Sequence, residues 1–218
     1  MDPLDLDSQL RAQVARATGT SADGQRVFKL KGDASNRSYY RVGDFPKSHV
    51  VMVMPPDAAK KSEEANKGEP PKELPFVNVQ RYLNALGVRV PKILKFDEPA
   101  GMMVLEDLGD QTFERELLEK GTREALYSEA VTLLASMRAR AEKKTDGACL
   151  AFTRAFDEDL YDWELHHFRE WGLEAWSGKQ PTTDERSALD GIFRRIAAQL
   201  AAAPRGFTHR DYQSRNLM

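Results

Sequence analysis

The chain has 218 residues, of which 41% are hydrophobic and 30% are charged, and its formal net charge is −2. These values are typical of a soluble globular protein with one large domain or two small lobes. They argue against a nucleic acid as the main partner, and no apolar stretch is long enough to span a bilayer. The single cysteine rules out an internal disulfide and the acidic start argues against a secretory signal, so we expect a cytoplasmic protein without a membrane partner.

The first third of the sequence predicts one helix and then three strands. Apolar residues recur at helical spacing over residues 7–18, and Gly19 is a natural stop. Alternating patterns predict strands at 27–31, 38–42 and 49–54. Short connections favour an antiparallel sheet, because parallel strands need long crossovers.

After residue 54 the pattern changes twice. Residues 55–75 hold two Pro pairs and mixed charges, and we expect a mobile surface loop there. The elements expected beyond it are a helix at 75–86, strands at 90–96 and 102–105, and helices at 112–120, from 122 onward, at 157–176 and at 183–203. This order predicts an α+β fold whose strand-containing part, 1–107, gives way to a helical part, 108–218.

The sharpest motif is His209-Arg210-Asp211, with Asn216 five residues after the Asp. It matches the catalytic loop H-R-D-x-x-x-x-N in every fixed position. In such a loop the Asp accepts the proton of the attacking hydroxyl and the Asn reaches the metal that bridges the nucleotide phosphates. We therefore interpret Asp211, with His209 and Arg210, as catalytic and Asn216 as a metal ligand. The alternative is a chance match in a surface loop, but residues 206–208 just before it are typical of a strand start.

A second candidate site is the turn at residues 32–37, between the first two strands. In kinases a loop at this place covers the phosphates with backbone N–H groups. We interpret Ser35, Asn36 and Arg37 as nucleotide-binding on this ground. The sequence is not G-x-G-x-x-G, and a plain hairpin turn is the alternative.

A third candidate is the extended segment at 104–109, which contains Glu106, Asp107 and Leu108 and would offer backbone groups to an adenine edge. The alternative is a strand that ends at a polar turn.

A fourth candidate is a helical face formed by Glu164, His167 and Trp171, which lie three and four residues apart. A carboxylate, an imidazole and an indole on one face could bind a sugar. A core-packing stripe is an equally good interpretation of the same residues.

Taken together, these motifs resemble the aminoglycoside phosphotransferase-like kinase family, and within it the bacterial kinases that phosphorylate the anomeric hydroxyl of N-acetylmuramate and N-acetylglucosamine in cell-wall recycling. The segments that carry the resemblance are 32–41, 88–91, 105–110, 168–171 and 208–218. The resemblance implies a bilobal protein-kinase-like fold, with a small antiparallel-sheet N-lobe at 1–107 and a helical C-lobe at 108–218. It also implies ATP and Mg²⁺ as cofactors and a small-molecule sugar as substrate. Arg215, in the run that favours the amino-sugar branch, joins the expected substrate-binding residues.

Two departures from the family pattern bear on these expectations. The third strand carries no Lys, so we expect Arg37 or Arg41 to neutralise the phosphates. Kinases also need a metal-binding Asp beyond the catalytic loop, and none follows Asn216 here. We therefore expect a C-lobe truncated at the catalytic loop and little turnover by this chain. A non-catalytic nucleotide-binding module, or a kinase for an aminoglycoside, choline or homoserine-like hydroxyl, remains an alternative.

Overall fold

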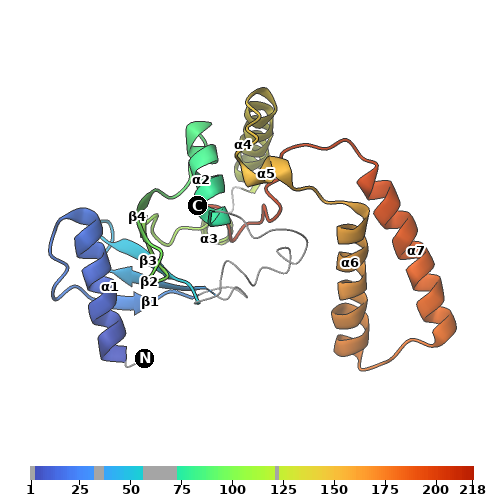
Figure 1. Ribbon diagram of the computed structural model, residues 1–218, viewed down its shortest axis with the longest axis horizontal. Coiled ribbons are helices and arrows are strands. Elements are labelled where there is room, and N and C mark those ends of the chain that lie inside the picture. Colours follow the sequence, from blue (N-terminus) through green and yellow to red (C-terminus); the bar gives the residue numbers. More distant parts are fainter. Residues whose placement is uncertain (1–2, 32–36, 56–72, 121–122) are drawn as a thin grey trace. The chain divides into compact units, whose positions relative to one another are not determined.

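A computed structural model describes residues 3–31, 37–55, 73–120 and 123–218 (Figure 1). The helices are α1 (Pro3–Thr18), α2 (Pro75–Ala85), α3 (Phe113–Lys120), α4 (Arg123–Lys143), α5 (Leu150–Thr153), α6 (Glu158–Phe168) and α7 (Thr183–Ala201). A π-helix, η2 (Arg169–Ala175), continues α6. The strands are β1 (Val27–Lys29), β2 (Ser38–Val42), β3 (His49–Val53), β4 (Ile93–Asp97) and β5 (Met102–Glu106).

The strands form one five-stranded sheet in the order β1-β2-β3-β5-β4, and every neighbouring pair is antiparallel. The mixed α and β class and the antiparallel sheet predicted from the short connections are thereby confirmed. The expected strand at 90–96 begins later, at Ile93. Pro91 lacks the backbone N–H that a strand pairing would use, which accounts for the late start.

The two faces of the sheet bury different residues because side chains alternate along each strand. On one face, Leu10 and Val14 of α1 pack against a cluster that includes Val51 and Val104. On the other face, Met52 and Met103 pack against residues of α2 and the segment before it. Full burial of side chains of this size contributes roughly 1.5–3 kcal/mol each, so both faces help to hold the sheet in place.

The chain divides into two compact units. One comprises Met1–Arg140 together with His209–Met218, and the other comprises Ala141–Thr208. In the second unit, α6 and α7 pack side by side and are joined by a short loop (Figure 1). The boundary predicted between residues 107 and 108 lies inside the first unit, and the two-lobe assignment stays a prediction.

Three local features differ from the sequence predictions. The single helix expected at 157–176 is α6 followed by the π-helix η2. Residues 206–208 are not a strand, and α5 was not expected. A Cβ at Gly172 of η2 would lie 2.9 Å from the ring of Phe168, so glycine leaves room for this ring. The part of the chain that the structure describes contains no helix with the length and hydrophobicity of a membrane span.

Candidate active site

The predicted catalytic pair, Asp211 and Asn216, comes together in the structure. The side-chain amide of Asn216 donates to Asp211 Oδ2 over 2.7 Å and to the Asp211 carbonyl over 3.0 Å. Because the amide nitrogen faces Asp211, the amide oxygen of Asn216 is directed to another side. The spacing of five residues therefore returns the chain on itself and places one amide against one carboxylate.

Gln213 is a third member of this loop that the sequence analysis missed. Its side-chain amide donates to the same oxygen, Asp211 Oδ2, over 3.2 Å. Both amides thus use Oδ2, and Asp211 Oδ1 has no hydrogen-bond partner among the described residues. An amide two residues after the Asp is the signal that could have pointed to it.

The loop is anchored to α4 through Tyr212. The Tyr212 hydroxyl donates to the carbonyl of Ala130 over 2.7 Å, and burial raises the pKa of this hydroxyl. The His209 ring meets Tyr212 edge to face, with centroids 5.1 Å apart. Burial lowers the pKa of His209, against the opposing effect of the Asp211 charge, so the ring favours its neutral form. His209 is thus placed as a packing partner within the loop.

Arg210, between His209 and Asp211, adopts a backbone φ of +76°. It is the non-glycine residue with positive φ in the described part of the chain. Such conformations cost free energy in residues with a Cβ and cluster at functional sites. The strain at Arg210 turns the chain directly before the carboxylate of Asp211.

The end of the loop pairs with the start of α3. The backbone N–H groups of Phe113 and Glu114 donate to the carbonyls of Leu217, over 2.8 Å, and Ser214, over 3.0 Å. These acceptors satisfy donors that the first turn of a helix leaves open. Arg215, an expected substrate-binding residue, instead lies 3.1 Å from Glu114 in an exposed ion pair.

The expected adenine-binding segment follows β5 directly. The Glu106 carboxylate accepts from Arg89 over 2.9 Å, and the Glu106 N–H donates to the carbonyl of Lys92 over 2.9 Å. Asp107 is buried and pairs with Arg41. By contrast, the backbone N–H and C=O of Leu108 have no hydrogen-bond partner among the described residues. Leu108 therefore offers a donor and an acceptor to a ligand.

Of the residues expected to bind the phosphates, the structure describes only the two arginines, Arg37 and Arg41. Ser35 and Asn36 lie outside the described residues. The Arg37 guanidinium stacks over the ring of Phe76, 5.8 Å from its centroid. Arg41 points to the segment after β5, where it pairs with Asp107 and Asp110.

Two of the expected sugar-binding residues meet in the second unit. The His167 ring stacks on Trp163 at 5.0 Å and contacts Trp171 at 6.1 Å, measured between ring centroids. Trp163 was missed by the sequence analysis, although it lies four residues before His167. Glu164 is exposed beside this row. The row is an exposed aromatic surface, because the relative exposure of Trp171 is 63%.

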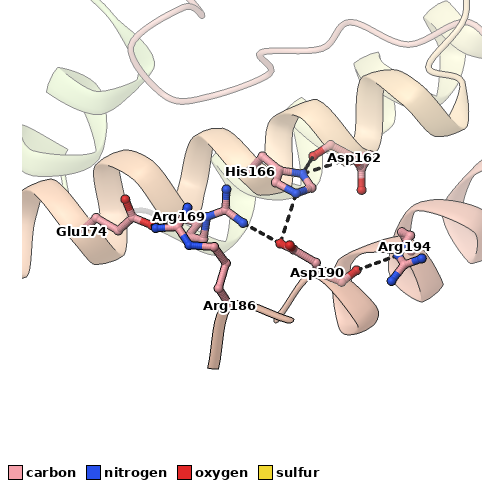
Figure 2. Close-up of polar contacts among 7 residues, drawn as sticks. All are labelled: Asp162, His166, Arg169, Glu174, Arg186, Asp190 and Arg194. Atoms are coloured by element: carbon pink, nitrogen blue, oxygen red, sulfur yellow. Dashed lines mark hydrogen bonds and ion pairs between the residues drawn. The ribbon is translucent and has the colours of Figure 1, made fainter. Parts of the chain in front are cut away.

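A network of charged side chains joins α6 and η2 to α7 (Figure 2). Arg169, buried at the start of η2, pairs with Asp190 of α7 at 2.5 Å and lies 3.3 Å from Glu174. His166 Nε2 lies 3.2 Å from the same Asp190 oxygen. Arg186 of α7 reaches Glu174 over 2.9 Å. These contacts tie α6 and η2 to α7.

A Mg²⁺ ion fits the donor set around Asp211. The described residues contain no cluster of three or more His, Cys, Asp or Glu side chains that could hold a metal ion by themselves. Mg²⁺ is usually bound through one or two protein oxygens together with substrate phosphates. The amide oxygen of Asn216 would be such a ligand, since the amide nitrogen already donates to Asp211.

Comparison with known proteins gives the same family that the sequence motifs resemble. Residues 27–218 match the phosphotransferase enzyme family (APH). The chain is 33% identical over 192 residues to the N-acetylmuramate/N-acetylglucosamine kinase of Pseudomonas aeruginosa, covering 88% of this chain and 51% of that protein. For the protein of the same name from Caulobacter vibrioides the identity is 32% over 236 residues, covering 94% and 62%.

A third relative of that name, from Neisseria meningitidis serogroup B, is 28% identical over 201 residues, covering 89% of this chain and 54% of the relative. The chain thus spans between half and two thirds of the length of these curated relatives. The match to the family covers the sheet, the helices after α1 and the loop that holds Asp211. The chain therefore belongs to the phosphotransferase enzyme family.

Proposed function

We propose that this protein is an ATP-dependent phosphotransferase that acts on a small hydroxylated substrate, with an N-acetylated amino sugar phosphorylated at its anomeric hydroxyl as the acceptor. The observation that carries the proposal is the contact between Asn216 and Asp211 Oδ2, which leaves Asp211 Oδ1 open. Support for the amino sugar comes from the relatives named N-acetylmuramate/N-acetylglucosamine kinase.

In this proposal Asp211 Oδ1 accepts the proton of the acceptor hydroxyl as its oxygen bonds to the γ-phosphorus and the bond to the leaving ADP oxygen breaks. Asn216 and Gln213 hold the carboxylate in one orientation through Oδ2. Positioning of this kind dominates phosphoryl transfer. Asn216 would hold Mg²⁺ through its amide oxygen, and the bound ion would neutralise charge on the phosphates.

The nucleotide site of the proposal combines Leu108, which supplies backbone groups for the adenine, with the segment at Ser35, Asn36 and Arg37 for the phosphates. Trp163, His167 and Trp171 are the proposed acceptor-binding surface, with Glu164 as a hydroxyl acceptor. The two-lobe, kinase-like architecture belongs to the same proposal.

The test is phosphate transfer from ATP to N-acetylmuramate and N-acetylglucosamine, followed as the sugar 1-phosphate, by the wild type and by Asp211→Asn. Loss of transfer in the variant supports the proposal, because Asn keeps the shape but cannot accept the proton. Equal transfer by both would contradict it. Aminoglycosides and choline serve as competing acceptors.

A second candidate is a non-catalytic nucleotide-binding module, and the observation that favours it is the absence of Lys from β3. A thermal shift with Mg-ATP and no transfer to any acceptor would support this candidate over the first.

A further inference from the structure

All three guanidinium nitrogens of Arg41 donate hydrogen bonds to the segment that follows β5. Nε donates to Asp107 Oδ2 over 2.6 Å and Nη2 to Asp107 Oδ1 over 3.0 Å, which makes a two-pronged pair. Nη1 donates to Asp110 over 2.8 Å, and Nη2 also reaches the Gly109 carbonyl over 3.1 Å. Only 11% of the Arg41 side chain is exposed. Little of the guanidinium is left for any other ligand.

Both carboxylate oxygens of Asp107 also accept more than one hydrogen bond. Oδ2 also accepts from the Ser48 hydroxyl over 2.5 Å, and Oδ1 accepts from the Gly109 N–H over 2.9 Å. The Asp107 side chain is 2% exposed. Burial opposes its ionisation, but hydrogen bonds from Arg41, Ser48 and Gly109 outweigh burial, and the pKa of Asp107 is lowered. Asp107 is thus a buried carboxylate that stays charged because its partners surround it.

The charge of this cluster does not suit a phosphate. Arg41 brings one positive charge, whereas Asp107 and Asp110 bring two negative charges. A triphosphate would meet a net negative cluster in which the cation is already paired. Neutralisation of the phosphates by Arg41, expected from the sequence, would require this cluster to come apart.

The same contacts fix the backbone on both sides of Leu108. Asp107 is held by Arg41 and Ser48, and Gly109 is held by Arg41. Gly109 has a φ of +88°, and a Cβ there would lie 3.2 Å from the Phe45 ring. Leu108, between these two fixed residues, keeps an unpaired N–H and C=O among the described residues.

We infer that Arg41, clamped on Asp107, is a positioning residue that presents the Leu108 backbone N–H and C=O to the edge of an adenine base. Adenine carries a neighbouring acceptor and donor on its pairing edge, which matches a backbone donor and acceptor held in a fixed place. The inference rests on the proposed nucleotide site but gives Arg41 a role in recognising the base. A fixed donor and acceptor also discriminate against guanine, whose corresponding edge has the opposite order.

Calorimetric binding of adenosine, Mg-ATP and Mg-GTP distinguishes the two roles of Arg41. If Arg41 positions the base site, Arg41→Met lowers the affinity for adenosine and the affinity for Mg-ATP by the same factor, about tenfold. The preference for Mg-ATP over Mg-GTP then narrows. If Arg41 instead holds phosphates, the variant weakens Mg-ATP and leaves adenosine unchanged, and the inference is overturned.

Further variants keep the test valid if Arg41→Met is poorly folded. Ser48→Ala removes one hydrogen-bond donor to Asp107 and is expected to lower the affinity for adenosine by about threefold. Arg26→Met, which breaks an exposed pair with Asp44, is the matched control and is expected to bind all three ligands like the wild type. Unchanged adenosine binding in Ser48→Ala and Arg41→Met would overturn the inference.

Turnover separates this inference from the proposed function. If Asp211→Asn transfers phosphate like the wild type, the proposed function fails while the adenosine result still decides the role of Arg41. If the wild type binds none of the three ligands, both fail. If Arg41 only positions the base site, Arg41→Met raises the KM for ATP by about tenfold and leaves kcat within about twofold of the wild-type value.

Discussion

Asn216 Nδ2 lies 2.7 Å from Asp211 Oδ2, and Gln213 reaches the same oxygen from 3.2 Å. Two amides on one carboxylate oxygen orient the other oxygen without neutralising it. The carboxylate of Asp211, the proposed base, is therefore held in one orientation by two side chains of its own loop.

Asn216→Ala is expected to lower kcat by about 100-fold, since a misplaced reacting group typically has an effect of this size. Gln213→Ala, which loses the longer contact, is expected to lower kcat by about tenfold. Steady-state kinetics with ATP and N-acetylmuramate measure both. A larger decrease in kcat for Gln213→Ala than for Asn216→Ala would contradict the prediction that the shorter contact matters more.

Tyr212→Phe removes the hydroxyl that donates to the Ala130 carbonyl at 2.7 Å. The free energy of unfolding is expected to fall by about 1 kcal/mol, because the variant removes one part-buried hydrogen bond to α4. Urea denaturation measures the change. Tyr127→Phe is the matched control, since its ring packs against Phe113 and is half exposed, and it is expected to change stability by less than about 0.5 kcal/mol.

The pair between Arg41 and Asp107 predicts a pH dependence of stability. The pKa of Asp107 is lowered in the folded state, so its contribution is present above the ordinary value of 3.8 and is lost as the pH falls through the lower folded value. The stability difference between the wild type and Asp107→Asn should therefore be constant near neutral pH and shrink below about pH 4. Denaturation at a series of pH values measures it. Asp44→Asn, in an exposed pair, should lower stability by at most about 1 kcal/mol at neutral pH.

Arg169→Met removes the cation that joins η2 to Asp190 of α7 (Figure 2). Breaking a fully buried pair costs several kcal/mol, but Asp190 is about one-third exposed, and we expect a loss of about 2 kcal/mol. Hydrogen exchange of residues in α6 and α7 should accelerate, while exchange in β2 and β3 stays unchanged. Arg194→Gln, which loses only a contact to the Asp190 carbonyl, is the control and should exchange like the wild type.

Trp171→Ala tests the proposed acceptor surface beside His167. The KM for the sugar is expected to rise about fivefold, which corresponds to about 1 kcal/mol of lost ring contact, with the KM for ATP unchanged. Trp176→Ala is the matched control, because Trp176 is 87% exposed and takes no part in the stacked row. Equal effects of the two variants would argue that the row does not bind the acceptor.

Local sequence patterns were sufficient for much of the fold. The strand at 38–42 has the predicted bounds, and α1 ends before Gly19, where φ is +72°. Such features depend on residues close together in the chain, through side-chain alternation and backbone freedom. The spacing of Asp211 and Asn216 belongs to the same class, because a turn of six residues brings the two side chains together.

The partners of Arg41 and Arg169 could not be read from the sequence. Arg41 meets Asp107, 66 residues away, because β2 lies beside β3 and β3 beside β5, an order that only the folded sheet sets. Arg169 meets Asp190 because η2 packs on α7. The sequence by itself determined most of the elements and the H-R-D-x-x-x-x-N motif, since these follow from local spacing. The tertiary structure decided which charges are paired, because pairing depends on which elements become neighbours when apolar surface is buried.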